Sequence, residues 1–373
     1  MSVPHPIDDR AEPAIGGSVS DERPVVLAVD GNSIVHRSFH ALAATGLRSA
    51  DGRPMWAVRG LLSQLVTAAE RVGPRAIVVG FDDPDASTRR DRWPQYKAHR
   101  TDKLETLISQ LALAAEVLTE LGLCVVTPAG LEADDVLAAT ARAARVAGAR
   151  TVVMTSDRDS FALIDDNTSV LRIINGGVDA SPMLTPERLV TLTGVRPDQY
   201  RDFAALRGDP SDNLPGVRGF GPKTAARLLA ATGSARAAFD DLAATGELVR
   251  QTVGVALAER LARPESRAAW ELNCQVMSFQ ADLDVPLVLE PGHRGVLPVE
   301  ADAVRAVFST QQLPSTTPYA LRALAHLEIA GPAPILASER AWSDSPRGNW
   351  SGQRFGRLPA KPKPAAEQLS LFG

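Results

Sequence analysis

The sequence lacks any apolar run long enough to cross a membrane. No stretch of about 18 apolar residues occurs, and the N-terminal "MSVPHPIDDRAEPAIGG" has no apolar core for a signal peptide. Cysteine is also scarce, because only Cys124 and Cys274 occur, far apart and without the spacing of a zinc site. The six histidines form no cluster with them. These absences argue against a membrane span and a zinc or disulfide scaffold, and they predict a cytoplasmic protein.

The chain also lacks the positive net charge that is common in nucleic-acid-binding proteins. Over 373 residues the formal net charge is -4, with 45% hydrophobic and 23% charged residues, which is the balance of a globular protein. The sum hides a separation of charge, however. Nine acidic residues belong to one cluster described below, and the rest of the chain is net positive. Charge therefore does not exclude a nucleic-acid partner.

Short valine-rich runs separated by helical patterns predict an α/β fold. The runs are four or five residues long, as expected for buried parallel strands, and they cover residues 25–29, 76–80, 124–127 and 151–155. The stretch 103–122 between two of them has a helical pattern. We therefore predict a three-layer α/β domain with a mostly parallel sheet over residues 24–182, after a disordered tail over residues 1–23.

The second half of the sequence changes to short helical segments. In "TPERLVTLTG", Thr185 suits an N-cap, Pro186 a first turn and Gly194 a stop. Further helical patterns, including "RPDQYRDFAALRG" and "GPKTAARLLAATG", predict a helical domain over residues 183–328. Residues 329–373 are rich in Pro, Gly, Ser and Arg without periodicity, and we interpret them as a flexible tail.

Acidic residues follow the predicted strands at their carboxyl ends. That edge of an open α/β sheet is where ligands bind, and "LEADD" begins a helix at the same edge. With two acids from "GDPSDN", the cluster comprises Asp30, Asp82, Glu132, Asp134, Asp135, Asp157, Asp159, Asp209 and Asp212. Glu132 and Asp135 are three residues apart and share a helix face, whereas Asp134 projects elsewhere.

So many carboxylates on one edge repel one another unless they are protonated or bound to metal. Two carboxylates about 5 Å apart repel by roughly 3 kcal/mol at an effective dielectric near 20. Two Mg²⁺ ions, or Mn²⁺ as a substitute, prefer such oxygen ligands, polarise a phosphodiester and supply a hydroxide. The cluster therefore predicts a two-metal hydrolase. Taken singly, each acid is also explained as a helix N-cap or part of a turn.

A basic segment follows Asp82. The stretch "STRRDRWPQYKAHRTDK" contains Arg89, Arg90, Arg92, Lys97, Arg100 and Lys103, with Trp93 and Tyr96 between them. Such interleaving suits a nucleic-acid strand, because cations meet phosphates and rings stack on bases. We predict that Lys97 and Arg100 share a helix face and contact the scissile phosphate, and that Arg90 and Tyr96 also bind DNA. The alternative is a solvated helical face.

A glycine-rich turn, "GVRGFGPK", precedes a predicted helix. Glycine lets the backbone approach a phosphate, and the helix N-terminus offers free N–H donors. The predicted DNA-binding residues of this turn are Gly216, Arg218, Gly219, Gly221, Lys223 and Thr224.

Five segments resemble a known family in their order and spacing. "VDGNSIVHRSFHAL", "GFDDPDASTRRDRWPQYKAHR", "GLEADDVLA", "VVMTSDRD" and "LRGDPSDNLPGVRGFGPKTA" resemble the bacterial 5′→3′ exonucleases. This family includes the 5′-nuclease domain of DNA polymerase I and belongs to the flap endonuclease superfamily. The resemblance covers about residues 24–328. It implies a PIN-like catalytic core, a helical arch over about residues 86–115 and a helix–hairpin–helix (H3TH) domain.

The resemblance also implies roles for the predicted site residues. Asp30, Asp82, Glu132, Asp134 and Asp135 match the first metal cluster of the family, and Asp157, Asp159, Asp209 and Asp212 match the second. Lys97 and Arg100 match the basic pair on the arch. The turn "GVRGFGPK" matches the one that holds duplex DNA, often with a monovalent cation such as K⁺.

The implied activity is that of a Mg²⁺-dependent 5′→3′ exonuclease or flap endonuclease. Its substrates are expected to be 5′ ends and flaps of DNA, and RNA primers, in replication and repair, and a monomer is expected. Two alternatives are a PIN-type ribonuclease, a family that lacks the "GVRGFGPK" segment, and a catalytically inactive, clamp-associated DNA-binding protein. The presence of all nine acids argues against the inactive protein.

The last residues suggest a partner. "QLSLF" resembles the pentapeptide by which many bacterial proteins bind the sliding clamp. Its residues are Gln368, Leu369, Ser370, Leu371 and Phe372. Gln368 suits a hydrogen bond at the pocket rim, and the leucines and phenylalanine suit apolar burial; a chance match is the alternative. Because only about 45 residues follow the nuclease region, we expect a stand-alone nuclease that reaches DNA through the clamp.

Overall fold

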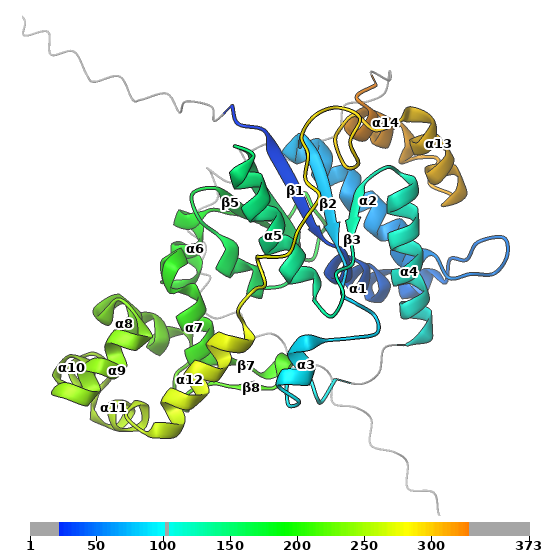
Figure 1. The fold of residues 1–373 in the computed structure, drawn as a ribbon. Helices are drawn as coiled ribbons and strands as arrows, with labels where there is room; N and C mark the ends of the chain where they lie inside the picture. Colours follow the sequence, from blue (N-terminus) through cyan, green and yellow to red (C-terminus); the bar gives the residue numbers. More distant parts are fainter. Residues whose placement is uncertain (1–21, 101–103, 328–373) are drawn as a thin grey trace, which may run out of the picture. The chain divides into compact units, whose positions relative to one another are not determined.

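A six-stranded sheet lies at the centre of the α/β part of the molecule (Figure 1). Its order is β3-β2-β1-β4-β5-β6, and only β6 runs antiparallel. The strands are β1 (Val25–Asp30), β2 (Ala76–Gly80), β3 (Cys124–Val126), β4 (Arg150–Thr155), β5 (Thr168–Arg172) and β6 (Met183–Leu184). The four predicted strands and their parallel pairing are confirmed. Strands β5 and β6 were not predicted, because "TSVLR" mixes polar and apolar residues.

This computed structural model describes residues 22–100 and 104–327. These residues all fall in one compact unit. Most of the predicted N-terminal tail, the C-terminal tail and the clamp peptide at residues 368–372 lie outside the described residues.

The α/β part has three layers. Alternate residues of β1 point to opposite faces, so Leu27 and Val29 pack into one core and Val26 and Ala28 into others. One face is covered by α1 (Gly31–Leu42), α2 (Trp56–Val72) and α4 (Glu105–Glu120), and the other by α5 (Ala133–Val146). The predicted three-layer class with a mostly parallel sheet is confirmed.

A helical part follows β6. Its elements are α6 (Pro186–Thr193), α7 (Tyr200–Arg207), β7 (Gly208–Asp209), β8 (Leu214–Pro215), α8 (Pro222–Thr232), α9 (Ala235–Ala244), α10 (Glu247–Val253), α11 (Val255–Leu261) and α12 (Pro264–Val276). Thr185 caps α6 by accepting a hydrogen bond from the Arg188 N–H, and Gly194 ends α6 in the left-handed conformation, as predicted. A core of apolar side chains, including Tyr200, Phe203 and Leu228, holds these helices together.

The last described helices differ from the prediction of one helical domain over residues 183–328. After α12 the chain runs without helix to residue 300 and then forms α13 (Ala301–Thr310) and α14 (Thr317–Ala325). These two helices pack on α2 and α4, and Phe308 and Leu324 join the core of the α/β part. Their amphipathic pattern predicts a helix but cannot tell which surface it covers.

The predicted arch over about residues 86–115 is also shorter in the structure. It contains the short helix α3 (Thr88–Arg92), a series of turns, and the first part of α4. From Leu107 onwards α4 belongs to the core, and the Gln110 side chain accepts a hydrogen bond from the Ala57 N–H. The buried face of α4 therefore limits any arch to residues before about Leu107.

Candidate active site

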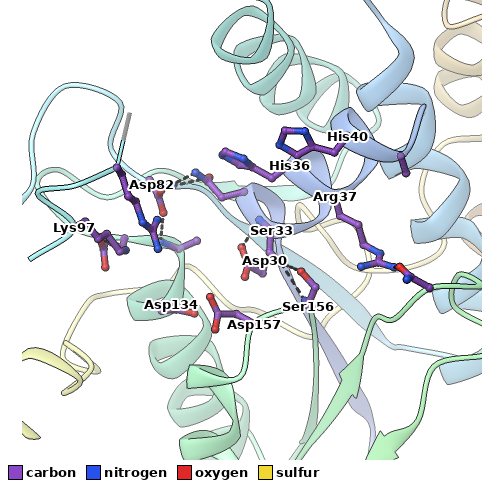
Figure 2. Close-up of a pocket in the computed structure, with 16 residues that line it drawn as sticks. Asp30, Ser33, His36, Arg37, His40, Asp82, Lys97, Asp134, Ser156 and Asp157 are labelled. Atoms are coloured by element: carbon purple, nitrogen blue, oxygen red, sulfur yellow. Dashed lines mark hydrogen bonds and ion pairs between the residues drawn. The ribbon is translucent and has the colours of Figure 1, made fainter. Parts of the chain in front are cut away.

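Acidic side chains from four segments line one cavity at the carboxyl edge of the sheet. Asp30 ends β1, Asp82 lies two residues beyond β2, and Asp157 lies two residues beyond β4. With Glu132 and Asp134 at the start of α5, they line a cavity of about 600 Å³ (Figure 2). The parallel register explains the convergence, because β1 lies between β2 and β4. The structure thus brings five of the nine predicted acids to one cavity.

Two of these acids also cap helices. Asp30 accepts hydrogen bonds from the Ser33 N–H (2.9 Å) at the start of α1 and from the Thr155 hydroxyl (2.7 Å). Asp82 accepts hydrogen bonds from the Ala133 N–H (3.0 Å) at the start of α5 and from the Asn32 amide (2.6 Å). The hydrogen bonds that Asp30 and Asp82 accept at the starts of α1 and α5 also hold their carboxylates at the cavity, so a capping role and a place at the cavity are compatible.

Burial and mutual repulsion raise the pKa values of several of these acids. Burial, together with the charges of Asp157 and Asp82, raises the pKa of Asp30 from 3.8 to about 7, against hydrogen bonds that lower it. The pKa of Asp134 also lies well above its usual range, through burial and the charges of Asp30, Asp157 and Asp159. Shifts of this kind are common where carboxylates are gathered for a function.

The remaining acids from the second predicted cluster lie close by. Asp159 and Asp212 line a narrow cavity of about 20 Å³ together with Glu132 and Asp134. Burial, with the charges of Asp157, Asp212 and Asp209, raises the pKa of Asp159 to about 8. Asp209 lines neither cavity, and its side chain accepts hydrogen bonds from the backbone and hydroxyl of Ser211.

The donor chemistry of these residues fits a hard divalent cation, since all the donors are carboxylate oxygens. Burial and then the charges of neighbouring carboxylates raise the pKa of Asp30, Asp134 and Asp159, and a bound cation relieves that repulsion. Among residues 22–100 and 104–327, however, no three acidic, histidine or cysteine side chains are already close enough together to hold a metal ion. The fit therefore rests on chemistry and proximity.

Asp135 does not share this environment, although it directly follows Asp134. Its side chain is completely buried, and it lines neither of the two cavities. Its carboxylate is bound to Arg89, to the Gln280 N–H and to the Glu132 N–H. This position does not favour the predicted role of a metal ligand. The separation of Asp134 from the face that Glu132 and Asp135 share is as predicted.

Lys97 and Arg100 both line the larger cavity, but they do not share a helix. Residues 94–99 form turns, and Lys97 has a φ of 56°, in the left-handed region. The Lys97 ammonium donates to Glu132 (2.8 Å), and Arg100 donates to Asp212 (2.5 Å). The predicted cations thus meet the predicted acids, through a turn where we expected a helix.

Tyr96 is buried, which contradicts the prediction that its ring is free to stack on a base. It packs with Leu214 and Val276 and donates a hydrogen bond from its hydroxyl to Glu132 (3.1 Å). Arg90, in contrast, is exposed on α3. Tyr96 therefore has a structural role, whereas the exposure of Arg90 is compatible with its predicted contact with DNA.

The glycine-rich turn precedes α8 as predicted. Arg218, Gly219, Gly221 and Lys223 are exposed, and Thr224 is half-buried. Gly219 has a φ of 91°, which favours glycine. Gly216 has a different explanation, because a side chain there would lie 2.1 Å from the Arg207 carbonyl oxygen. Close backbone packing therefore explains Gly216 without any ligand.

The structure adds residues to the cavity that the sequence analysis missed. His36, Arg37 and His40 from α1 form a basic wall of the larger cavity, together with Asn175 (Figure 2). Arg37 donates a hydrogen bond to the Asn175 side chain (2.8 Å). The signal was present as "HRSFH" in the helix that follows Asp30, since His36 and His40 are four residues apart and share a helix face.

Comparison with protein families identifies the chain. A model described as the N-terminal resolvase-like domain of 5′–3′ exonucleases matches residues 25–193. A second model, the C-terminal SAM fold of 5′–3′ exonucleases, matches residues 195–293. Together they cover well over half of the chain. The chain belongs to the 5′–3′ exonuclease family. The second match contains the "GVRGFGPK" segment that the alternative PIN-type ribonucleases lack.

Relatives of the chain include bacterial DNA polymerases. DNA polymerase I of Mycobacterium tuberculosis is 37% identical over 286 residues, which are 77% of this chain and 30% of that protein. The thermostable DNA polymerase I of Thermus thermophilus is 34% identical over 349 residues, which are 93% of this chain and 38% of that protein. The chain thus spans between 30% and 38% of the length of these relatives.

Solved structures show the same fold. The bacteriophage T5 flap endonuclease, in a complex with DNA and metal ions, has a TM-score of 0.54 and 19% identity, covering 80% of this chain and 99% of that chain. The catalytic core of Rad2 with DNA substrate has a TM-score of 0.51 and 17% identity, covering 81% and 93%. Within the described part of this 5′–3′ exonuclease, no helix has the length and apolar character needed to cross a membrane.

Proposed function

We propose that this 5′–3′ exonuclease hydrolyses phosphodiester bonds at the 5′ ends and 5′ flaps of DNA, with Mg²⁺ as its metal and Mn²⁺ as a substitute. One observation carries the proposal: a cavity lined by five acids is also lined by the cations Lys97, Arg100 and Arg37. Acids alone suit a metal, and cations alone suit a phosphate. Their combination suits a metal-assisted reaction at a phosphodiester.

The acids that face the two cavities are the proposed metal ligands. They are Asp30, Asp82 and Asp157 in the larger cavity and Asp159 and Asp212 in the narrow one, and Glu132 and Asp134 line both. A bound divalent metal would polarise the phosphodiester and lower the pKa of water to give a nucleophile at neutral pH. Asp209 is proposed to act at longer range, through its effect on Asp159.

The basic side chains at the cavity are proposed to orient the DNA strand. Lys97 and Arg100 are bound to Glu132 and Asp212, so a phosphate that enters the cavity exchanges one anionic partner for another. Arg37 and the two histidines of α1 face the same cavity from the other side. Arg90, together with Arg218, Lys223 and the N-terminus of α8, supplies further exposed positions for phosphates.

The similar proteins support DNA as the substrate. The bacteriophage T5 enzyme and Rad2 are described in complexes with DNA, and the phage enzyme also with metal ions. The matched relatives are DNA polymerases, of which this chain resembles only the part that corresponds to its own length. A role in DNA replication and repair agrees with both comparisons.

A flap assay tests the proposal directly. The substrate is a DNA duplex with a 5′ single-stranded flap, labelled at its 5′ end, and the products are sized to the nucleotide with Mg²⁺, with Mn²⁺ and with chelator. We expect metal-dependent products released near the junction. A protein that binds this DNA but releases no product with either metal would contradict the proposal, and preferred cleavage of unstructured RNA would favour the PIN-type ribonuclease.

Several finer predictions accompany this function. They are action on RNA primers, a K⁺ ion at the glycine-rich turn, a monomeric state, a cytoplasmic location and binding of the sliding clamp through residues 368–372. Deletion of residues 368–373 tests the last of these. We expect loss of clamp binding in a pull-down experiment, with flap cleavage on free DNA unchanged.

A further inference from the structure

Arg89 forms a complete set of hydrogen bonds inside the protein. Its side chain is only 9% exposed. Its Nε donates to the Val276 carbonyl (3.2 Å), Nη1 donates to Glu132 (2.7 Å) and Asp135 (3.0 Å), and Nη2 donates to Asp135 (2.6 Å) and the Ser278 carbonyl (3.0 Å). A guanidinium has five N–H groups, so every one of them is used.

Asp135 is satisfied in the same way. Its Oδ1 accepts hydrogen bonds from Arg89 (2.6 Å) and the Gln280 N–H (2.8 Å), and its Oδ2 accepts from Arg89 (3.0 Å) and the Glu132 N–H (3.1 Å). A carboxylate accepts about four hydrogen bonds. Because all four come from the protein and the side chain is buried, Asp135 has no lone pair that faces the cavity.

This arrangement ties three distant segments together. Arg89 belongs to α3, Asp135 belongs to α5, and Val276, Ser278 and Gln280 lie at and just beyond the end of α12. We name Arg89, Glu132, Asp135 and these three backbone partners the Arg89 junction. A fork of five donors with bidentate geometry suits such a junction, whereas a lysine ammonium does not reproduce it.

The junction leads to the catalytic cavity through Glu132. One oxygen of Glu132 accepts hydrogen bonds from Arg89 (2.7 Å) and the Tyr96 hydroxyl (3.1 Å), and the other accepts from the Lys97 ammonium (2.8 Å). Arg89 therefore holds Glu132, and Glu132 holds the Lys97 ammonium, which lines the cavity.

From this geometry we infer that Arg89 and Asp135 are positioning residues that orient Lys97 through Glu132, and that Asp135 is not a metal ligand. The inference rests on the proposed function for its effect on catalysis. Its structural content is independent of that function. It removes Asp135 from the nine predicted metal ligands and gives it the role of holding Arg89, at the start of the basic segment.

Metal binding separates the two roles of the neighbouring acids. The full chain is titrated with Mn²⁺ alone by calorimetry, as wild type, Asp134→Asn and Asp135→Asn. We expect the Kd for Mn²⁺ to rise by at least about tenfold in Asp134→Asn and by clearly less in Asp135→Asn, where only the position of Glu132 changes. An equal loss of affinity in both variants would make Asp135 a metal ligand and overturn the inference.

A double-mutant cycle tests the route through Lys97. We expect Arg89→Lys to lower kcat on the flap substrate by about 10- to 100-fold with little change in KM, because Lys97 is misplaced in the bound complex. Once Lys97→Ala is present, adding Arg89→Lys should cost no further activity. Fully additive losses would show that Arg89 acts elsewhere. The exposed Arg142→Met on α5 is the matched surface control.

Hydrogen exchange keeps the inference testable if the flap activity itself is not found. We expect Arg89→Lys and Asp135→Asn to exchange amide hydrogens faster over residues 93–100 and 276–281, while Arg142→Met does not. Unchanged exchange at both segments would overturn the junction. An inactive wild type with faster exchange in these variants would instead reject only the proposed function.

Discussion

Asp134 and Asp135 are neighbours in the sequence with opposite surroundings. Asp134 faces the cavities, where burial and then the charges of other carboxylates raise its pKa well above the usual range. Asp135 points into the Arg89 junction, where a guanidinium and two N–H groups surround it. A shift of one residue along the helix therefore points Asp134 towards other carboxylates and Asp135 towards a guanidinium and two N–H groups.

Buried carboxylates of this region differ in their charged neighbours. Asp30 and Asp135 are both buried. Burial, with the charges of Asp157 and Asp82, raises the pKa of Asp30 to about 7. Glu132 lies between the two regions. Burial would raise its pKa, but Lys97 and Arg89 outweigh that effect and lower it. The "EADD" motif thus contains an acid that faces the cavities, Asp134, and an acid that is held in the Arg89 junction, Asp135.

The largest effect is expected for the acids that face the larger cavity. Asp134→Asn and Asp157→Asn should each lower kcat on the flap substrate by roughly 10³-fold or more, equivalent to about 4 kcal/mol. DNA affinity should stay within a few-fold of the wild type, because neither side chain is a cation. The measurement is single-turnover cleavage with binding by anisotropy. A variant that loses binding but cleaves at a normal rate once bound would break the assignment.

Removal of the Arg89 guanidinium from the Arg89 junction should lower the stability of the protein. Arg89→Met leaves the buried charge of Asp135 without its cationic partner and removes one of the two cations bound to Glu132, so the free energy of unfolding should fall by about 3–5 kcal/mol. Chemical denaturation measures this change. In Arg89→Met/Asp135→Leu part of the stability should return, since the uncompensated charge of Asp135 is gone. A single variant as stable as the wild type would show that the junction is not needed for stability.

The raised pKa values predict how stability depends on pH. A carboxyl with a higher pKa in the folded state binds its proton more tightly there, so the stability that it contributes is lost as the pH rises through the folded pKa. Asp30 and Asp159 should therefore lower the stability of the metal-free protein by on the order of 2 kcal/mol from about pH 6 to about pH 8.5. Calorimetric Tm values measured in chelator test this.

The matched control for the pH dependence is the variant Asp30→Asn/Asp159→Asn. Its Tm should change less over the same pH range, because the two groups that titrate are removed. A wild-type Tm that rises from about pH 6 to about pH 8.5 would contradict the direction of the shifts.

The smallest effect is expected at the glycine-rich turn before α8, away from Asp134 and Asp135. Arg218→Ala and Lys223→Ala remove exposed cations near the start of α8, so each should weaken DNA binding only a few-fold and reduce the slope of log Kd against log salt by about one. Flap cleavage at saturating DNA should be unchanged. A salt slope equal to that of the wild type would show that these residues do not meet phosphates.

Regular elements with local signals could be predicted from the sequence. The valine-rich strands lie within one residue of their predicted limits, and Thr185 and Gly194 cap α6 as expected. In contrast, β5 was missed, because its Thr, Ser and Arg residues hide a strand that lies between β4 and β6. Helices α13 and α14 were recognised as helical but assigned to the wrong surface, because an amphipathic pattern does not name its partner.

The sequence predicts which kinds of side chain meet at the candidate site better than it predicts the role of each residue. The strand ends predict that Asp30, Asp82 and Asp157 meet, because parallel strands place their carboxyl ends at one edge. Nothing local distinguishes Arg89 from Arg90, although one is buried in five hydrogen bonds and the other is exposed. That distinction depends on backbone carbonyls almost 190 residues further along the chain.

The sequence by itself determined the parallel α/β core, the gathering of acids at its carboxyl edge and the family, because strand periodicity and motif spacing are local properties of the chain. Only the tertiary structure decided which acids face the cavity and which are neutralised, that Tyr96 is buried, and that α1 supplies a basic wall. Charge partners are set by contacts between distant segments, and the electrostatic state of a carboxylate depends on those partners more than on its own position in a motif.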